Sequence, residues 1–209
     1  MAELIGTFIV VAFATGSIVI DAKYGGVLGL PFIAFAPFVG VAIGVYLFGK
    51  ISMAHFNPAV TVGYFITGHI TLRQLPKYFT AEIIGALLAS IFVKHIIGGY
   101  ANLGANVPNY NFPIPVIFAV ELVATALLMS VILIVVYNRG LKGFSGIVIG
   151  GIIGLDIIFF SFISGASMNP ARSLAPALLS GTFGDLWLYW SATFIGSSII
   201  ALFLRRKFV

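Results

Sequence analysis

Hydrophobic residues occur along this chain in long runs that are separated by short polar or glycine-rich segments. A helix needs roughly 20 residues to cross the apolar core of a bilayer, which is about 30 Å thick. Six runs are long enough, and we predict membrane-spanning helices over residues 4–20, 29–48, 76–97, 115–137, 144–163 and 186–204. Two further apolar stretches, 58–66 and 170–179, are too short to cross, and we predict that each enters the membrane without spanning it.

The composition is typical of an integral membrane protein, because 60% of the residues are hydrophobic and only 8% are charged. A soluble domain carries about 25% charged residues. The formal net charge of +5 comes from basic residues that stand singly between apolar runs, so it indicates orientation rather than nucleic-acid binding. There is no cysteine, the histidines lack metal-ligand spacing, and no nucleophile–base pair or phosphate loop is visible. We therefore expect no metal, no cofactor and no enzyme activity.

One tripeptide occurs twice, as Asn57-Pro58-Ala59 and as Asn169-Pro170-Ala171, at the start of the two short stretches. The surrounding residues share the frame Ile-Ser-x-Ala-x-x-Asn-Pro-Ala at an offset of 112 residues. Pro suits the first position of a helix, Asn is a good N-cap, and the residue before a Pro is pushed out of the helical region. Each copy therefore predicts a short helix that begins at the Pro and is capped by the Asn.

The repetition extends beyond the tripeptides, since Glu121 in Ala-Val-Glu-Leu corresponds to Glu3 in Ala-Glu-Leu. We predict a single transmembrane domain over residues 1–209, built from repeats 1–100 and 115–209 that are joined by the uncharged loop 98–114. Each repeat holds three spans, and three is odd, so the second repeat lies upside down relative to the first. The predicted fold class is an all-α membrane protein of six spanning helices with two re-entrant half-helices in an inverted repeat.

The basic residues fall mainly on one side of the predicted membrane. With both termini on the cytoplasmic side, that side holds Lys50, Arg73, Lys77, Arg139, Lys142, Arg205, Arg206 and Lys207. Only Lys23 and Lys94 fall on the outer side. Because Lys and Arg favour cytoplasmic loops, we expect a multi-pass protein of the plasma membrane with both termini in the cytoplasm.

The two short helices would bring their N-termini together near the membrane midplane, since about ten helical residues extend about 15 Å. Each N-terminus presents free N–H groups and about half a positive charge, which attract a water oxygen and repel a cation. A water that accepts from both Asn57 and Asn169 points its hydrogens away along the path and cannot relay a proton. Arg172 lies at membrane depth, where a charge costs about 2.5–3.5 kcal/mol, and we interpret it as a cation-repelling donor at a constriction.

Over nearly the whole chain, the paired Asn-Pro-Ala motifs, the Arg that follows the second and the inverted halves resemble the aquaporins and glycerol facilitators, the major intrinsic proteins. The resemblance implies a selectivity filter formed by Arg172, Ala166, Ile157 and either Pro37 or Phe38. It implies that Glu3 and Glu121 hydrogen-bond the backbones of the two re-entrant loops, and that the protein is a homotetramer. Ile157 and Ala166 are more similar to the less polar filters of archaeal and vacuolar-type members than to a His-containing filter.

The resemblance also implies a passive channel that conducts water, with small neutral solutes such as ammonia and urea, and excludes protons and ions. Ser173 stands where glycerol facilitators usually carry Asp, and Ala177 with Tyr189-Trp190 resembles the water-channel pattern. A glycerol or small-solute facilitator remains an alternative. A secondary transporter, from a different class, is another, because inverted repeats with broken helices also describe those proteins.

Overall fold

The computed structural model describes residues 1–205, and for Arg139 and Lys142 it describes the backbone but not the side chains. Six of the described helices are long and apolar enough to cross a membrane: α1 (Ala2–Lys23), α2 (Gly29–Ser52), α4 (Leu75–Ile96), α6 (Ile114–Tyr137), α7 (Ser145–Ser164) and α9 (Leu186–Leu204). Two half-helices, α3 (Pro58–Ile66) and α8 (Pro170–Ser180), start at the two Asn-Pro-Ala motifs. The short α5 (Ala101–Gly104) and the 3-10 helix η1 (Arg139–Phe144) lie in connections. The predicted fold class is confirmed.

Helix α2 continues to Ser52, four residues beyond the predicted end at Phe48, and stops at Met53, which has a left-handed backbone with a φ of 66°. Pro37 lies inside this helix without ending it. Its missing N–H leaves the carbonyl of Ile33 without the usual helical partner. The Ser17 hydroxyl of α1 donates to that carbonyl at 3.5 Å, so a neighbouring helix partly satisfies it.

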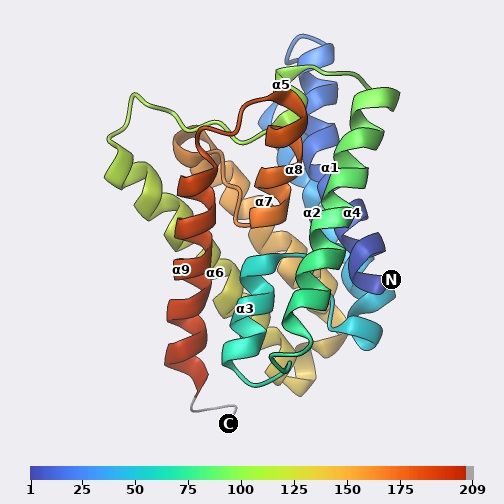
Figure 1. Cartoon of the computed structure of the whole chain (residues 1–209), viewed down its shortest axis with the longest axis vertical. Helices are drawn as coiled ribbons and strands as arrows, with labels where there is room; N and C mark the ends of the chain where they lie inside the picture. Colours follow the sequence, from blue (N-terminus) through green and yellow to red (C-terminus); the bar gives the residue numbers. More distant parts are fainter. Residues whose placement is uncertain (206–209) are drawn as a thin grey trace.

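The helices pack in the same pattern in the two halves of the chain. Helix α1 packs against α2 and α4, and its counterpart α6 packs against α7 and α9, while α2 and α7 join the halves. Each half-helix packs against a long helix of the other half, α3 against α9 and α8 against α4. Figure 1 shows α8 in the upper part of the bundle and α3 in the lower part, with the connection through α5 crossing the top.

Two glycines allow the closest helix crossings. A Cβ on Gly85 of α4 would lie 2.3 Å from the carbonyl oxygen of Leu4 in α1, and one on Gly196 of α9 would lie 2.4 Å from that of Leu122 in α6. No side chain fits at either distance, so both crossings need glycine. The two crossings are equivalent in the two halves, which gives the repetition a physical basis in backbone contact.

Lys23 and Lys94, which depart from the predicted charge asymmetry, have local roles at helix ends. The Lys23 ammonium donates to the carbonyl of Ile97 at the end of α4, at 3.2 Å. The Lys94 ammonium donates to the carbonyl of Leu179 in the last turn of α8, at 3.4 Å. A cation is favourable at the negative end of a helix, so these contacts account for both lysines. Of the residues on which the orientation prediction rests, Arg206 and Lys207 lie outside the described part of the chain.

Candidate functional site

A cavity of about 760 Å³ lies along helices α1, α2, α6 and α7. Helix α2 contributes one face over almost its whole length, through Leu30, Ile33, Pro37, Val41, Val45, Gly49 and Lys50. From Leu30 to Gly49 these positions recur every three or four residues, as expected for one face of a helix, and Tyr46 and Lys50 lie beside that face. The stretch from Leu30 to Lys50 corresponds to about 30 Å of helix, the thickness of the apolar core of a bilayer. We call its two ends the α5 end, near Leu30, and the η1 end, near Lys50.

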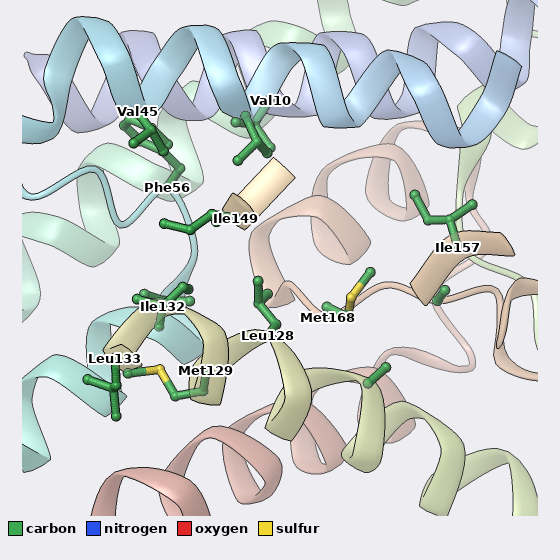
Figure 2. Close-up of a cluster of buried hydrophobic side chains, with 14 of the residues drawn as sticks. Val10, Val45, Phe56, Leu128, Met129, Ile132, Leu133, Ile149, Ile157 and Met168 are labelled. Atoms are coloured by element: carbon green, nitrogen blue, oxygen red, sulfur yellow. The ribbon is translucent and has the colours of Figure 1, made fainter. Parts of the chain in front are cut away.

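The wall of the cavity is largely the apolar core of the protein. Val10, Val45, Leu128, Ile149 and Met168 belong to the largest cluster of buried apolar side chains and also line the cavity (Figure 2). Among the described residues, no Asp or Glu lines it, whereas Lys50 and Arg172 do. A cation in this cavity would therefore meet no carboxylate and two positive charges, which disfavours its entry.

Asn57 and Asn169 cap the two half-helices and bind to each other's loops. The Oδ1 atom of Asn57 accepts from the backbone N–H of Ala59 at 2.9 Å, and that of Asn169 accepts from Ala171 at 3.0 Å. The Nδ2 atom of Asn57 donates to the carbonyl of Met168 at 2.8 Å, and that of Asn169 donates to the carbonyl of Phe56 at 2.9 Å. A carboxamide has two N–H groups. Each asparagine therefore keeps one donor beyond these contacts, and both residues line the cavity.

The two loops before the half-helices repeat the same unusual backbone. Left-handed φ values occur at Met53 (66°), Ala54 (52°) and Phe56 (52°), and again at Gly165 (83°), Ala166 (45°) and Met168 (54°). Non-glycine residues in this region cost roughly 1–2 kcal/mol each. Such conformations persist only where surrounding contacts fix them, and they are concentrated at functional sites.

Two buried glutamates supply those contacts. Glu3 accepts from the Ser52 hydroxyl at 2.5 Å, from the backbone N–H of His55 at 3.1 Å and from that of Phe56 at 2.7 Å. In the second half, Glu121 accepts from the Ser164 hydroxyl at 2.9 Å, from the N–H of Ser167 at 3.1 Å and from the N–H of Met168. Each carboxylate therefore satisfies three donors of one strained loop, and the hydrogen-bonded positions are equivalent in the two halves.

Arg172 lies one turn into α8 and is almost completely buried, with 7% of its surface exposed. Its Nη1 atom donates to Oδ1 of Asn106, in the connection between α5 and α6. Ser173 donates to the same oxygen at 3.2 Å, and Nδ2 of Asn106 donates to the carbonyl of Gly165 at 2.8 Å. Asn106 therefore connects the guanidinium, the start of α8 and the strained loop before it.

The structure separates the two alternatives for the predicted filter residue on α2. Ile157, Ala166, Arg172 and Pro37 all line the cavity. Phe38 is not among the lining residues, because its side chain and backbone pack against Gly150 of α7, where an added Cβ would lie 2.5 Å from the Phe38 carbonyl oxygen. Of the two alternatives, Pro37 therefore has the position that a filter residue requires.

A buried polar chain follows the first loop and lacks a counterpart of the same chemistry in the second half. The Nδ1 atom of His55 lies 2.8 Å from the Thr61 hydroxyl, which donates to Glu82 at 2.5 Å. The His55 ring stacks between Tyr64 and Tyr78, with both centroids at 4.4 Å. At the equivalent positions of the second half, Ser167 and Ser173 hydrogen-bond to each other. These contacts of His55 with Thr61, Tyr64 and Tyr78 fix the position of the first loop. Among the described residues, no group of side chains could hold a metal ion.

The sequence reasoning missed Asn106, which bonds to Arg172 across 66 positions of sequence. The one sequence feature that could have indicated a role for Asn106 is the connection in which it lies, which is long, uncharged and rich in asparagine. A second contact fixes this connection at the α5 end, because Tyr110 donates to Asp185 before α9. That hydrogen bond, with burial and the negative charge of Asp185, raises the pKa of Tyr110 above its ordinary value.

Comparison with known proteins gives the family. A model of the family described as "Major intrinsic protein" matches residues 1–204. The chain belongs to the major intrinsic proteins. A solved structure of this kind, the aquaglyceroporin from Plasmodium falciparum, matches with a TM-score of 0.90 and 25% identity, over 98% of this chain and 93% of that one.

Plant aquaporins are among the similar sequences. Aquaporin NIP3-1 of Arabidopsis thaliana is 38% identical over 93% of this chain, and Nodulin-26 of Glycine max is 35% identical over 94%. The chain spans 62% of the length of the Arabidopsis protein and 73% of that of Nodulin-26. The resemblance inferred from the motifs is confirmed, and this major intrinsic protein is a passive channel for water and small solutes. The similarity of its filter to archaeal and vacuolar-type members stays a prediction.

Proposed function

We propose that this channel conducts water and small neutral solutes such as urea and ammonia through the cavity between α1, α2, α6 and α7, and excludes protons and cations. The observation that carries the proposal is the course of the cavity, which passes both capping asparagines and the guanidinium of Arg172. Its wall is mostly apolar, with scattered polar side chains and no carboxylate among the described residues, so solutes that need no counter-charge cross it at the lowest cost.

Protons are excluded at the two asparagines. Asn57 and Asn169 each have one amide N–H beyond their contacts with the opposite loop. The N-termini of α3 and α8 add the positive ends of two helix dipoles. A water molecule that accepts from both amides points its own hydrogens outward, so the hydrogen-bonded file changes direction there and does not relay a proton. The same dipoles raise the energy of any cation at this point.

Solutes are selected at a filter formed by Arg172, Ile157, Ala166 and Pro37, which all line the cavity. The guanidinium supplies donors to the filter, while Ile157 and Pro37 supply apolar side chains. A filter of this composition has fewer donors than one with histidine at residue 157. It therefore admits water and excludes small neutral solutes only weakly.

Glycerol conduction is the second candidate, and the match to a protein that is called an aquaglyceroporin favours it. The residues Ser173, Ala177, Tyr189 and Trp190 favour water, and we propose that glycerol passes slowly. A secondary transporter fits less well, because among residues 1–205 no carboxylate lines the cavity to bind a coupling ion. We propose that the protein is not an enzyme and acts without a cofactor.

We further propose that the protein lies in the plasma membrane with both termini in the cytoplasm and assembles as a homotetramer. The charge asymmetry along the sequence supports the orientation. Large apolar side chains on the outward faces of the spanning helices, such as Phe35, Phe159 and Leu202, support close contact with lipid or with other subunits.

The experiment that tests the proposal is stopped-flow light scattering on proteoliposomes, with osmotic gradients of an impermeant solute, urea and glycerol compared at equal amounts of protein. We expect fast water flow, measurable urea flow and slow glycerol flow, all proportional to concentration and without saturation. Glycerol flow as fast as urea flow would favour the facilitator. Saturation or coupling to an ion gradient would favour the transporter.

A further inference from the structure

Asn106 occupies an unusual place, because it lies far from the Asn-Pro-Ala motifs in sequence and yet contacts both the start of α8 and the strained loop before it. It is 8% exposed and lines the cavity. Its Oδ1 atom accepts from Arg172 and, at 3.2 Å, from Ser173, while its Nδ2 atom donates to the carbonyl of Gly165 at 2.8 Å. Among the described residues, it is the only side chain that accepts a hydrogen bond from the guanidinium.

The segment before Asn106 is built to hold it in place. Ala101, Asn102, Leu103 and Gly104 have φ values of 46°, 50°, 58° and 69°, which is a left-handed turn made mostly of non-glycine residues. A Cβ on Gly104 would lie 2.7 Å from the carbonyl oxygen of Thr15 in α1, so the turn presses directly against that helix. Leu103 is 2% exposed, and α5 also packs against α8. An unfavourable conformation fixed by such packing indicates that the position of the residues after it matters.

A guanidinium needs this kind of support. An arginine side chain has several rotatable bonds and five N–H donors, and Arg172 lies beside a cavity that offers water as a competing partner. The acceptor of Asn106 holds the guanidinium against the wall of the cavity. Without it, the freed donors would turn toward water in the cavity and narrow the path.

From this geometry, we propose that Asn106 is a positioning residue of the filter, which keeps the path open by binding the guanidinium of Arg172 to the wall. The inference rests on the proposed role of Arg172 in the filter. It assigns the connection between α5 and α6 a part in selectivity through one side-chain oxygen, to which Ser173 also donates.

The test is the water permeability of Asn106→Leu in proteoliposomes, measured by stopped-flow light scattering at equal amounts of reconstituted protein. We expect a decrease of about threefold or more, the size typical of residues that share a hydrogen-bond network. The matched control is Asn109→Leu in the same connection. Asn109 donates to the carbonyl of Phe162 at 3.0 Å and accepts from Asn111 at 3.1 Å, but does not touch Arg172, so its replacement should leave water permeability unchanged.

A double-mutant comparison separates positioning from loop packing. If Asn106 acts through the guanidinium, Asn106→Leu has no further effect on water permeability when Arg172 is already Val. The same loss in the Arg172→Val background would show that Asn106 only packs the connection, and would overturn the inference. Wild-type water permeability in Asn106→Leu would overturn it as well. If Arg172→Val alone leaves both water flow and ion exclusion unchanged, the proposed filter itself is wrong, which is a distinguishable result.

A second variant keeps the proposal testable if Asn106→Leu does not fold. Asn106→Asp retains an oxygen for Arg172 and loses only the donor to Gly165. Its water permeability should stay close to that of the wild type, while the added negative charge beside the guanidinium should increase the leak of small cations. Loss of water permeability in a folded Asn106→Asp protein would show that the acceptor is not what matters.

Discussion

Asn57 and Asn169 each donate to the backbone carbonyl of the residue that precedes the other asparagine, at 2.8 Å and 2.9 Å. The two half-helices are therefore not merely placed end to end but tied together by a reciprocal pair of hydrogen bonds. The side-chain oxygens cap the helices, and the remaining amide N–H groups are left for the cavity. One residue type thus serves stability and conduction through the different polar atoms of a single carboxamide.

Removal of either asparagine should destabilise the protein. Asn57→Ala and Asn169→Ala each lose a helix cap and leave a buried carbonyl of the opposite loop without its donor, so we expect a loss of about 2 kcal/mol or more. Thermal unfolding in one fixed detergent measures the effect. The control is Asn138→Ala, which removes the exposed cap of η1 and should cost at most about 1 kcal/mol. Equal stability of the three variants would contradict the role of the reciprocal pair.

Glu121→Gln should destabilise the protein through the second loop, although glutamate and glutamine have nearly the same shape. Glu121 accepts three donors with two oxygens, and a glutamine would direct its own N–H groups at one of those donors. We expect a loss of about 2–3 kcal/mol in unfolding free energy. Asp21→Asn is the matched control, because Leu28 and Gly29 both donate to one oxygen of Asp21, which an asparagine retains. A comparable loss in both variants would argue against this account.

Met53 and Gly165 occupy equivalent positions in the two loops, with φ values of 66° and 83°. Only glycine adopts this region without a penalty, so Met53→Gly should raise the unfolding free energy by up to about 1 kcal/mol, after the greater entropy of glycine in the unfolded chain is taken into account. Gly165→Met should lower it by more than that, since Tyr189 and Val107 lie 3.3 Å from an added Cβ. Thermal unfolding of the two variants should therefore shift in opposite directions.

How far the sequence allowed prediction depended on how local each signal was. The half-helices follow from Pro58 and Pro170 with their preceding asparagines, because capping involves residues only two or three apart. Helix α2 ended later than predicted, because its end is fixed by the left-handed Met53 and not by the change in hydrophobicity at Phe48.

The filter was less predictable, because its members come from separate elements. Counting along the sequence could not choose between Pro37 and Phe38, since the choice depends on which face of α2 meets α7. Asn106 could not be found at all from local patterns. Its partner Arg172 lies in another half of the chain, and only the packing of α5 against α1 and α8 brings the two together.

Ile157→His should change which solutes pass. Ile157 lines the cavity and is 9% exposed, so a histidine there would add a donor and bulk to the cavity wall. We expect urea permeability to fall more than water permeability, because water regains hydrogen bonds from the new donor while the larger solute meets a narrower opening. Stopped-flow measurements give the ratio of the two permeabilities. An unchanged ratio would remove Ile157 from the filter.

The exclusion of charge is tested most directly by Arg172→Val, with water flow and ion leak followed in the same proteoliposomes. Light scattering reports the water flow, and an enclosed pH-sensitive dye reports the dissipation of a proton gradient with and without small cations. Arg73→Val, at an exposed position outside the cavity, is the control. We predict that wild type and control conduct water without a proton or cation leak, whereas Arg172→Val folds, still conducts water and leaks. A variant that conducts water and excludes ions as well as the wild type would contradict the account.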